Sequence, residues 1–439
     1  MSLLVERYWA MFAHDRELAE AARKYMPDGV STDSRILIPF PIYVDQASGS
    51  RKVTMAGHEL IDYWAGHGAL LLGHGAPAVT RAVARQLARG THFAACHNLA
   101  VDWAHAVTRL VPGADQVRFT ASGTEAVLLA IELACAHTGK TGVLRFSGHY
   151  HGWHGSIHCD DETSQDRVVV CRSHDIAAAA DCLRADSDIA CIIVEPTGPC
   201  SGVVPYDGAF IRELRALSAA HGVLLIFDEV VTGFRVAPGG AQELFGVVPD
   251  LTTLAKVLCG GLPGGAVAGR REFLAPLRKQ NTSVTSHRPP IAHMGTFSGN
   301  PLSAAAGVAM LREVATKGLH ERLDSFAGKL RKRLNQVIDQ HRLDWVVYGT
   351  SSCIKFLIGH GQRGLNTGDF DPRACAPAVL LGRGDAELIR GLRLAMLVHG
   401  VDIAPSSFVT SAHTEKDIDE TAAALDASIE LLRRDGLIR

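Results

Sequence analysis

Val223-Leu224-Leu225-Ile226-Phe227-Asp228-Glu229-Val230 is the stretch that decides the fold. Five apolar residues followed at once by two carboxylates are typical of a strand that is buried on both faces and ends at a polar rim. Four earlier apolar runs are also predicted as strands, at residues 117–120, 143–146, 168–171 and 189–194. Helical segments separate them, at residues 76–89, 125–137 and 207–221. This alternation predicts an α/β fold, with a large, mostly parallel sheet covered by helices on both faces.

The two ends of the chain differ from this central region. Apolar residues recur at helical spacing over residues 319–338 and 418–432, and strand-like segments lie at 345–348 and 354–358. The first 60 residues look irregular, apart from a two-strand signal at 42–44 and 52–55. We therefore predict an N-terminal segment (1–60) that packs with the small domain, a large domain (61–315) and a small C-terminal α+β domain (316–439).

Composition narrows the class of protein. The 439 residues include 47% hydrophobic and 21% charged residues, with a formal net charge of −2. This balance is typical of a soluble globular protein and favours neither a nucleic-acid nor an anionic-membrane partner. There is no apolar run of about 20 residues and no signal-peptide layout, so a cytoplasmic location is expected. The ten cysteines are scattered, which favours buried thiols over a metal site.

Ligands of open parallel sheets bind beyond the carboxyl ends of the strands, so the loops that follow the predicted strands are the place to look for chemistry. Ser122-Gly123-Thr124 opens a helix and is suited to a phosphate, although the motif taken alone favours an ordinary helix cap. Tyr150 offers an aromatic face for stacking. His149, His151 and His154 have no carboxylate at ligand spacing, which argues against a metal ion.

Asp228 and Lys256 are the two ionisable groups that most need an explanation. Asp228 ends a wholly apolar strand and needs a partner, either an arginine or lysine or the N–H of a heterocyclic ring. Glu229 is expected to pair with Arg235. Lys256 is flanked by apolar residues, which favours a neutral amine or a Schiff base. Gly260-Gly261-Leu262-Pro263-Gly264-Gly265 follows too late in the chain for a dinucleotide fingerprint, so a nicotinamide enzyme is disfavoured.

Five motifs, in register over roughly residues 25 to 430, resemble those of class III aminotransferases, which belong to fold-type I of the pyridoxal-phosphate (PLP) enzymes. They are Ser122-Gly123-Thr124-Glu125-Ala126, Tyr150-His151-Gly152, Asp228-Glu229-Val230, Lys256 and Gly295-Thr296-Phe297-Ser298-Gly299-Asn300-Pro301. The resemblance implies a PLP-dependent aminotransferase (transaminase) with the fold-type I architecture.

The resemblance also implies a role for each matching residue. Ser122, Gly123 and Thr124 would bind the PLP phosphate, Tyr150 would stack on the ring beside His151, and Glu195 would lie near the phenolic side. Asp228 would pair with the pyridine nitrogen, with Val230 packed beneath the ring. Lys256 would form the Schiff base and then move the proton between the substrate Cα and cofactor C4′. Thr296 would reach the phosphate of the neighbouring subunit, which implies a homodimer.

Within the class, the chain resembles glutamate-1-semialdehyde aminomutase and D-phenylglycine aminotransferase. This rests on Gly29-Val30-Ser31 with Arg35, and on Ser411-Ala412-His413-Thr414-Glu415-Lys416-Asp417. Arg35 matches an arginine that holds a substrate carboxylate, a task that suits its fork of donors; a surface arginine near a domain seam is the other interpretation.

Four positions depart from the aminomutase pattern. His67 replaces a pocket tryptophan, Cys200 replaces an asparagine, and the stretches after Trp153 and at 405–408 are shortened. An aminomutase must retain its diamino intermediate, so the loss of a closing loop disfavours that activity. The favoured function is transfer of an amino group from a carboxylated amine to a keto acid, with pyridoxamine phosphate as the intermediate cofactor form and His67 near the substrate. Aminomutase activity is the alternative, and a non-catalytic PLP-binding protein is a third class that the intact Lys256 and Asp228 disfavour.

Overall fold

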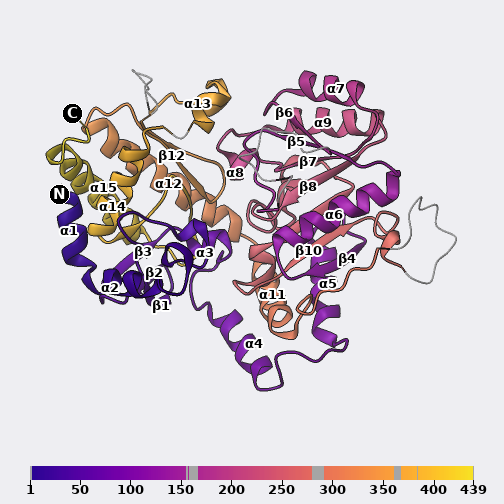
Figure 1. Ribbon diagram of the computed structural model, residues 1–439, viewed down its shortest axis with the longest axis horizontal. Helices are drawn as coiled ribbons and strands as arrows, with labels where there is room; N and C mark the ends of the chain where they lie inside the picture. Colours follow the sequence, from indigo (N-terminus) through magenta and orange to yellow (C-terminus); the bar gives the residue numbers. More distant parts are fainter. Residues whose placement is uncertain are drawn as a thin grey trace.

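A seven-stranded sheet forms the centre of one lobe of the computed structural model (Figure 1), which describes residues 2–154, 157, 167–278, 291–359, 367–382 and 384–438. The strand order is β4-β10-β9-β8-β7-β5-β6. All neighbours are parallel except β10, which is antiparallel to both β4 and β9. The strands are β4 (Gln116–Thr120), β5 (Gly142–Phe146), β6 (Val168–Cys171), β7 (Ile189–Val194), β8 (Leu224–Glu229), β9 (Leu251–Ala255) and β10 (Gly265–Gly269). The predicted α/β fold is confirmed.

Two of these strands escaped prediction. β9 has the sequence Leu-Thr-Thr-Leu-Ala, in which central threonines interrupt the apolar run. β10 has the sequence Gly-Ala-Val-Ala-Gly, whose small residues carry a weak strand signal. All ten residues are buried, because neighbouring strands and helices cover them. Tertiary packing, not local propensity, sets these two strands.

Helices cover both faces of the sheet because successive side chains of each strand point to opposite sides. In β8, Leu225 and Phe227 pack with α7 (Ile176–Ala185) and α9 (Gly208–Ala220). Leu224 and Ile226 pack on the other side with α6 (Gly123–Thr138). Three further helices, α4 (Pro77–Leu87), α5 (Asn98–Leu110) and α11 (Pro301–Val314), pack together below this lobe in the view of Figure 1.

The other lobe combines the two ends of the chain (Figure 1). Its helices are α12 (Leu319–Gln340), α14 (Ala386–Val398) and α15 (Glu415–Arg434), beside a sheet of β11 (Val346–Tyr348), β12 (Cys353–Leu357) and β14 (Ser406–Phe408). From the N-terminus come α1 (Leu3–Met11), α2 (Ala13–Ala22), β1 (Val44–Ser48), β2 (Arg51–Thr54) and β3 (Glu59–Asp62). β3 pairs with β13 (Val401–Asp402), and α1 packs on α14. The predicted domain boundaries at residues 60 and 315 stay predictions.

The description of the first 60 residues as irregular was wrong. Leu4, Tyr8 and Phe12 lie one helical turn apart and are buried, so α1 forms by docking a narrow apolar stripe. Polar and charged residues between these positions weaken the apolar periodicity that would predict the helix from sequence. The two-strand signal was correct in kind but displaced: the strands are β1 and β2, and β3 completes the hairpin series.

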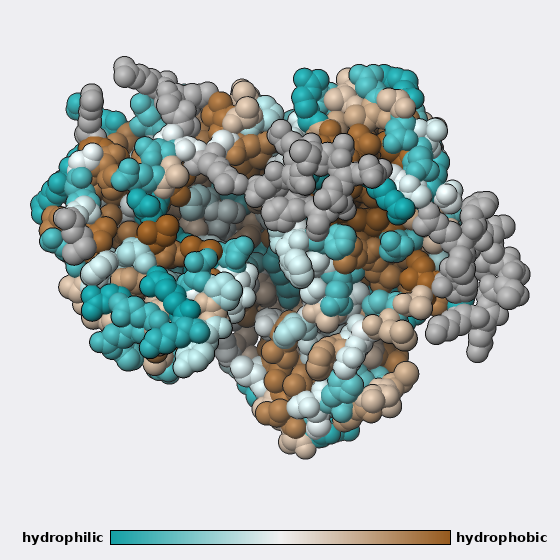
Figure 2. All heavy atoms as spheres, viewed as in Figure 1, coloured by the Kyte–Doolittle hydropathy of each residue, from teal (hydrophilic) through white to brown (hydrophobic). Residues whose placement is uncertain are grey.

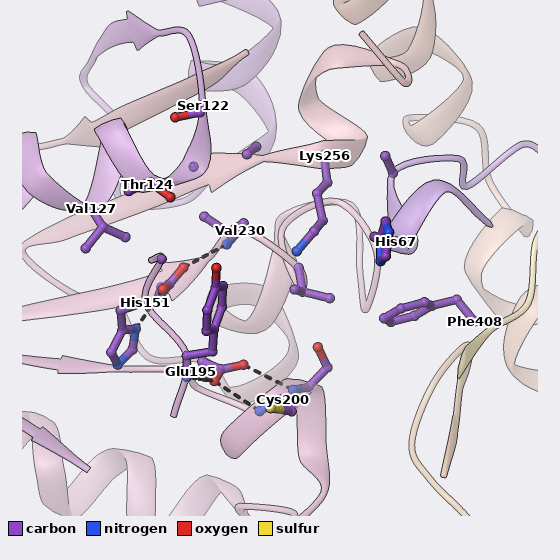
Figure 3. Close-up of a pocket in the computed structure, with 18 of the residues that line it drawn as sticks. His67, Ser122, Thr124, Val127, His151, Glu195, Cys200, Val230, Lys256 and Phe408 are labelled. Atoms are coloured by element: carbon purple, nitrogen blue, oxygen red, sulfur yellow. Dashed lines mark hydrogen bonds and ion pairs between the residues drawn. The ribbon is translucent and has the colours of Figure 1, made fainter. Parts of the chain in front are cut away.

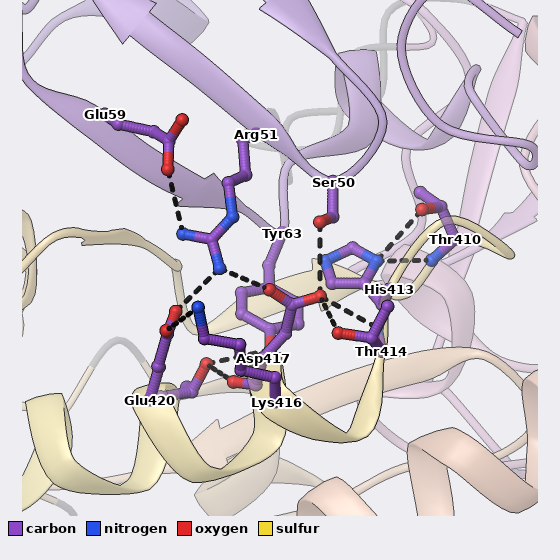
Figure 4. Close-up of polar contacts among 11 residues, drawn as sticks. Ser50, Arg51, Glu59, Tyr63, Thr410, His413, Thr414, Lys416, Asp417 and Glu420 are labelled. Carbon is purple, nitrogen blue, oxygen red and sulfur yellow. Dashed lines mark hydrogen bonds and ion pairs between the residues drawn. The ribbon is translucent and has the colours of Figure 1, made fainter.

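A polar network fastens the N-terminal strands to the last helix (Figure 4). Arg51 Nη2 donates to Asp417 Oδ1 at 2.8 Å and to Glu420 Oε2 at 2.6 Å, while Ser50 Oγ donates to Asp417 Oδ2 at 3.2 Å. Asp417 is 1% exposed and also closes the capping box of α15 with Thr414. Such charge-assisted bonds to a buried carboxylate are among the stronger hydrogen bonds in proteins.

His413, next to this network, should make the stability of the protein fall in acid. Burial lowers its pKa to about 4, and its Nδ1 accepts the Thr410 N–H at 3.1 Å. The unfolded chain titrates near the ordinary 6.5, so as the pH falls the unfolded state binds this proton first. We expect this group alone to lower the free energy of unfolding by about 2 kcal/mol between pH 7 and pH 5.

Denaturant unfolding of the protein and of His413→Asn at both pH values measures this effect. Asparagine can accept the same hydrogen bond but does not titrate, so the variant should lose about 2 kcal/mol less than the wild type. An identical pH dependence in the two proteins would contradict the assignment.

Candidate active site

A cavity of about 790 Å³ lies at the carboxyl ends of the parallel strands, where the two lobes meet. Figure 2 shows the surface hollowed between the lobes. Ten of the twelve predicted site residues line the cavity, namely His67, Ser122, Gly123, Thr124, Tyr150, His151, Glu195, Asp228, Val230 and Lys256. Arg35 and Thr296 do not line it. The loops that follow β4, β5, β7, β8 and β9 therefore meet at one place.

One end of the cavity is built to approach an anion closely. Ser122 caps α6 by accepting the Glu125 N–H at 3.2 Å, and the first N–H groups of a helix have no partner within it. Gly123 is needed for packing: an added Cβ would lie 3.0 Å from both γ-methyl groups of Val230. The 16-residue helix adds a favourable dipole at this end. Backbone and dipole together suit a phosphate.

Gly123→Ala should weaken binding of a phosphate-bearing cofactor about tenfold, since overpacking a close contact costs about 1–3 kcal/mol. The new methyl group pushes against Val230 and the start of α6, which moves the N–H groups that bind the phosphate. Fluorescence titration of the apoprotein measures the dissociation constant. Gly328→Ala is the matched control, because a Cβ at Gly328 in α12 meets only the end of Arg331 at 3.9 Å. If the Gly123 variant and the control bound the cofactor with equal affinity, the assignment of this helix N-terminus as the phosphate site would be refuted.

Asp228 is held in a fixed orientation at the end of β8. It is 4% exposed. Its Oδ2 lies 2.7 Å from His151 Nδ1, and its Oδ1 accepts the Thr253 hydroxyl at 3.0 Å and the Val230 N–H at 3.1 Å. A buried carboxylate held in this way suits a fixed N–H donor or cation inside the cavity. Sequence reasoning missed Thr253, and its only signal was its place in the strand that leads to Lys256.

Glu195 pins the loops on the opposite side of the cavity. Oε1 accepts the N–H groups of Tyr150 at 2.8 Å and Cys200 at 3.0 Å, and Oε2 accepts the Ser201 N–H at 3.1 Å. Burial raises its pKa. His149 Nδ1 accepts the Glu195 N–H at 3.0 Å, and burial holds the His149 pKa well below its usual value. A neutral, fully bonded His149 is a structural residue, and among the described residues no cluster could hold a metal ion.

Lys256 reaches into the cavity from the end of β9, between Val230 on one side and His67 on the other (Figure 3). Its backbone is left-handed, with φ 50°. Burial lowers the pKa of its amine, and the charges of Asp228 and Glu195 oppose that shift. A lowered pKa increases the fraction of neutral, nucleophilic amine.

His67 and Phe408 form the wall that faces Lys256 (Figure 3). His67 lies in a left-handed turn, with φ 47°, 61°, 55° and 83° over residues 65–68. Asp62 holds the start of that turn by accepting the N–H groups of Trp64 at 3.1 Å and Ala65 at 3.2 Å. Burial, followed by the charges of Lys256 and Arg35, lowers the pKa of His67.

Arg35 and Thr296 lie apart from the cavity. Arg35 is exposed and donates to the Ser31 hydroxyl, although its charge reaches His67. Thr296 is exposed, and its carbonyl oxygen lies 2.6 Å from His92 Nε2. Their assigned roles stay predictions.

The expected Glu229–Arg235 ion pair was wrong. Glu229 accepts instead from Thr232 Oγ1 and from the Ala241 N–H, at 3.1 and 2.6 Å. Arg235 is buried beside the ring of Phe408 and donates to Ser352 Oγ and to the carbonyl oxygens of Gly68 and Val409. These partners come from distant parts of the chain, so spacing along the sequence could not reveal them.

The comparisons with known proteins agree with this geometry. The family model described as "Aminotransferase class-III" matches residues 34–163 and 158–347. The chain belongs to the class III aminotransferase family. This class III protein is 36% identical to glutamate-1-semialdehyde 2,1-aminomutase from Ignicoccus hospitalis, over 95% of this chain and 99% of that one. It is 33% identical to the enzyme of the same name from Methanopyrus kandleri, over 96% and 98%.

Solved structures of transaminases resemble this chain as well. An omega-transaminase from Sphaerobacter thermophilus superposes with a TM-score of 0.85 at 27% identity, over 95% of this chain and 98% of that chain. A beta-phenylalanine aminotransferase from Variovorax paradoxus gives 0.84 at 29%, over 98% and 97%.

The cofactor of this class III enzyme is pyridoxal phosphate, as in a structurally similar transaminase that carries it. The cavity fits that group. It offers a helix N-terminus for the phosphate and Asp228 for the ring nitrogen. Lys256 lines the same cavity and offers an amine for the aldehyde. The buried Nε2 of His151, which also lines the cavity, has no hydrogen-bond partner among the described residues. None of the described helices is long and apolar enough to cross a membrane.

Proposed function

We propose that the protein transfers an amino group from a carboxylated amine to a keto acid. The observation that carries this proposal is the presence of Lys256 and the buried, oriented Asp228 in one cavity. When bound, pyridoxal phosphate supplies an aldehyde that takes the amino group and a protonated ring that withdraws electrons.

The residues of the chain divide the remaining work. Asp228 holds the proton of the ring nitrogen, and Thr253 and His151 keep the carboxylate oriented. With the cofactor bound, Lys256 would move the proton between the substrate Cα and cofactor C4′, a role that its lowered pKa favours. Ser122, Gly123 and Thr124 would bind the phosphate, Tyr150 and Val230 would hold the ring between them, and Glu195 would lie near its phenolic side.

Intramolecular transfer is the second candidate, and the sequence relatives favour it. The curated relatives at 33–36% identity are named aminomutases. Two features of the cavity favour transfer between molecules: His67 stands where the aminomutase pattern has tryptophan, and Cys200 where it has asparagine. The shortened stretch after Trp153 also entered that prediction, but residues 155–156 and 158–166 lie outside the described part of the chain.

Two assays separate the candidates. The holoenzyme is mixed with α-, β- and D-amino acids, and conversion of the cofactor to its amine form is followed by absorbance. Amino transfer predicts conversion with at least one donor and its reversal by a keto acid. Formation of 5-aminolevulinate from glutamate-1-semialdehyde without an added keto acid would establish the aminomutase instead.

A homodimer is part of the proposal, with Thr296 of each subunit reaching the phosphate bound by the other. The segment around Thr296 carries exposed apolar side chains, with Met294 88% and Phe297 63% exposed. Exposed side chains of this kind favour a protein contact. Sedimentation equilibrium of the holoenzyme measures its oligomeric state. A fully active monomer would refute the proposed homodimer.

A further inference from the structure

A second cavity of about 740 Å³ adjoins the cofactor cavity. The two share five lining residues, Trp64, Cys200, Ala404, Pro405 and Ser406. Beyond this junction the walls are mainly aliphatic, with Leu357 and Leu380 among them. A ligand attached to the cofactor could therefore extend into an apolar compartment.

Lys355 stands at the junction. It is 1% exposed, and its Nζ donates to the Cys200 carbonyl oxygen at 2.7 Å and to Ser406 Oγ at 2.5 Å. An ammonium group has three donors, so one remains for a ligand or for the ring of Phe408, whose centroid lies 5.8 Å from Nζ. In the described part of the chain no carboxylate lies within ion-pair distance of Nζ. Burial lowers the pKa of this amine; the charge of Glu195 opposes that shift, but the Glu195 oxygens accept loop N–H groups. A carboxylate bound beside Nζ would favour the charged amine.

The surroundings of the second cavity are positive rather than neutral. Arg390 and Arg393 line it with Lys355, and its described lining contains no aspartate or glutamate. Arg393 lies over the ring of Trp64 at 4.9 Å, and its buried Nε has no described hydrogen-bond partner. Arg390 is exposed and lies 3.8 Å from Glu387, so Lys355 and Arg393 are the cations of this lining with no carboxylate within ion-pair distance among the described residues. A cation without a paired carboxylate is costly to bury, so a site that keeps two is suited to an anion.

We propose that Lys355 binds the carboxylate of the substrate and that the second cavity takes the apolar remainder. The inference rests on the proposed amino transfer and narrows its substrate class. Lys355 lines the second cavity, and its partners Cys200 and Ser406 line both cavities, so the bound carboxylate lies at the junction. The substrate class is then a carboxylated amine with an apolar body, and Lys355, not Arg35, is the residue that selects it.

Binding of a substrate mimic tests this without any turnover. The probe is 3-phenylpropanoate, titrated calorimetrically into the holoenzyme, with the neutral 3-phenylpropanamide as its isostere. We expect the carboxylate to bind at least tenfold more tightly than the amide, as a charge-assisted hydrogen bond predicts. In Lys355→Met this preference should disappear, while Lys355→Arg should keep most of it.

Three controls make the result specific. Lys355→Gln is a second neutral variant if methionine prevents folding, and the cofactor absorbance reports an intact site. Arg390→Met removes a cation of the same cavity whose side chain is 42% exposed, so it should lower the preference less. Arg35→Ala should leave it unchanged.

The inference is overturned if the wild type shows no preference, if the neutral Lys355 variants retain it, or if Arg35→Ala alone abolishes it. Amino transfer itself is judged separately from conversion of the cofactor by amine donors. A holoenzyme that binds the carboxylate through Lys355 but converts no donor would refute the transferase and leave the anion site standing.

Discussion

Lys256→Ala should abolish covalent attachment of the cofactor and lower the rate of amino transfer by at least about 10²–10⁴-fold, the usual contribution of a positioned acid–base group. Lys256 is the lysine that lines the cavity, and burial lowers the pKa of its amine. Alanine removes both the nucleophile and the proton carrier. Absorbance spectra of the purified variant with added pyridoxal phosphate, and single-turnover rates with an amine donor, measure the two losses.

Two further variants control this result. Lys256→Arg keeps the positive charge but not the nucleophile, so it should fail in the same two assays. Lys24→Ala removes an exposed lysine and should behave as the wild type. If Lys256→Ala still showed the spectrum of a covalently held cofactor, the proposed function would have to be abandoned.

Asp228→Asn should lower the rate about 10²–10³-fold while the cofactor remains bound. The asparagine side chain has the same size and can still accept the Thr253 hydroxyl, but it no longer supplies the negative charge that keeps a ring nitrogen protonated. Loss of one preorganised electrostatic contact in a dry site has an effect of this size. Stopped-flow measurement of Cα–H cleavage with deuterated and protiated donors isolates the affected step.

Thr253→Val distinguishes charge from orientation. It removes one hydrogen bond to Asp228 Oδ1 and leaves the charge, so its rate should fall about tenfold or less. Equal losses in Thr253→Val and Asp228→Asn would mean that Asp228 acts through packing and not through its charge.

The sequence predicted the active-site edge of the sheet better than it predicted the lobe of the two chain ends. β8 begins with an unbroken apolar run, so the strand and the position of Asp228 near its carboxyl end were plain from local pattern. β10, made of small residues, and α1, with a narrow apolar stripe, depend on what packs against them. Lys355 and Cys200 are 155 residues apart, and no periodicity links them. The predicted ion pair of Arg235 with Glu229 was wrong because it relied on their closeness in sequence. The hydrogen-bond partners of Arg235 come from distant segments of the chain.

The pairing of β3 with β13, and of Arg51 with Asp417, has a consequence for biosynthesis. The seven strands of the central sheet span residues 116–269 and can associate while the ribosome is still translating the remainder. Residues 44–62, made earlier, can pair with one another, but β3 and Arg51 must wait for residues 401–420 to gain their distant partners. This segment therefore docks only after the central sheet has been synthesised, and its polar groups stay without those partners during that interval.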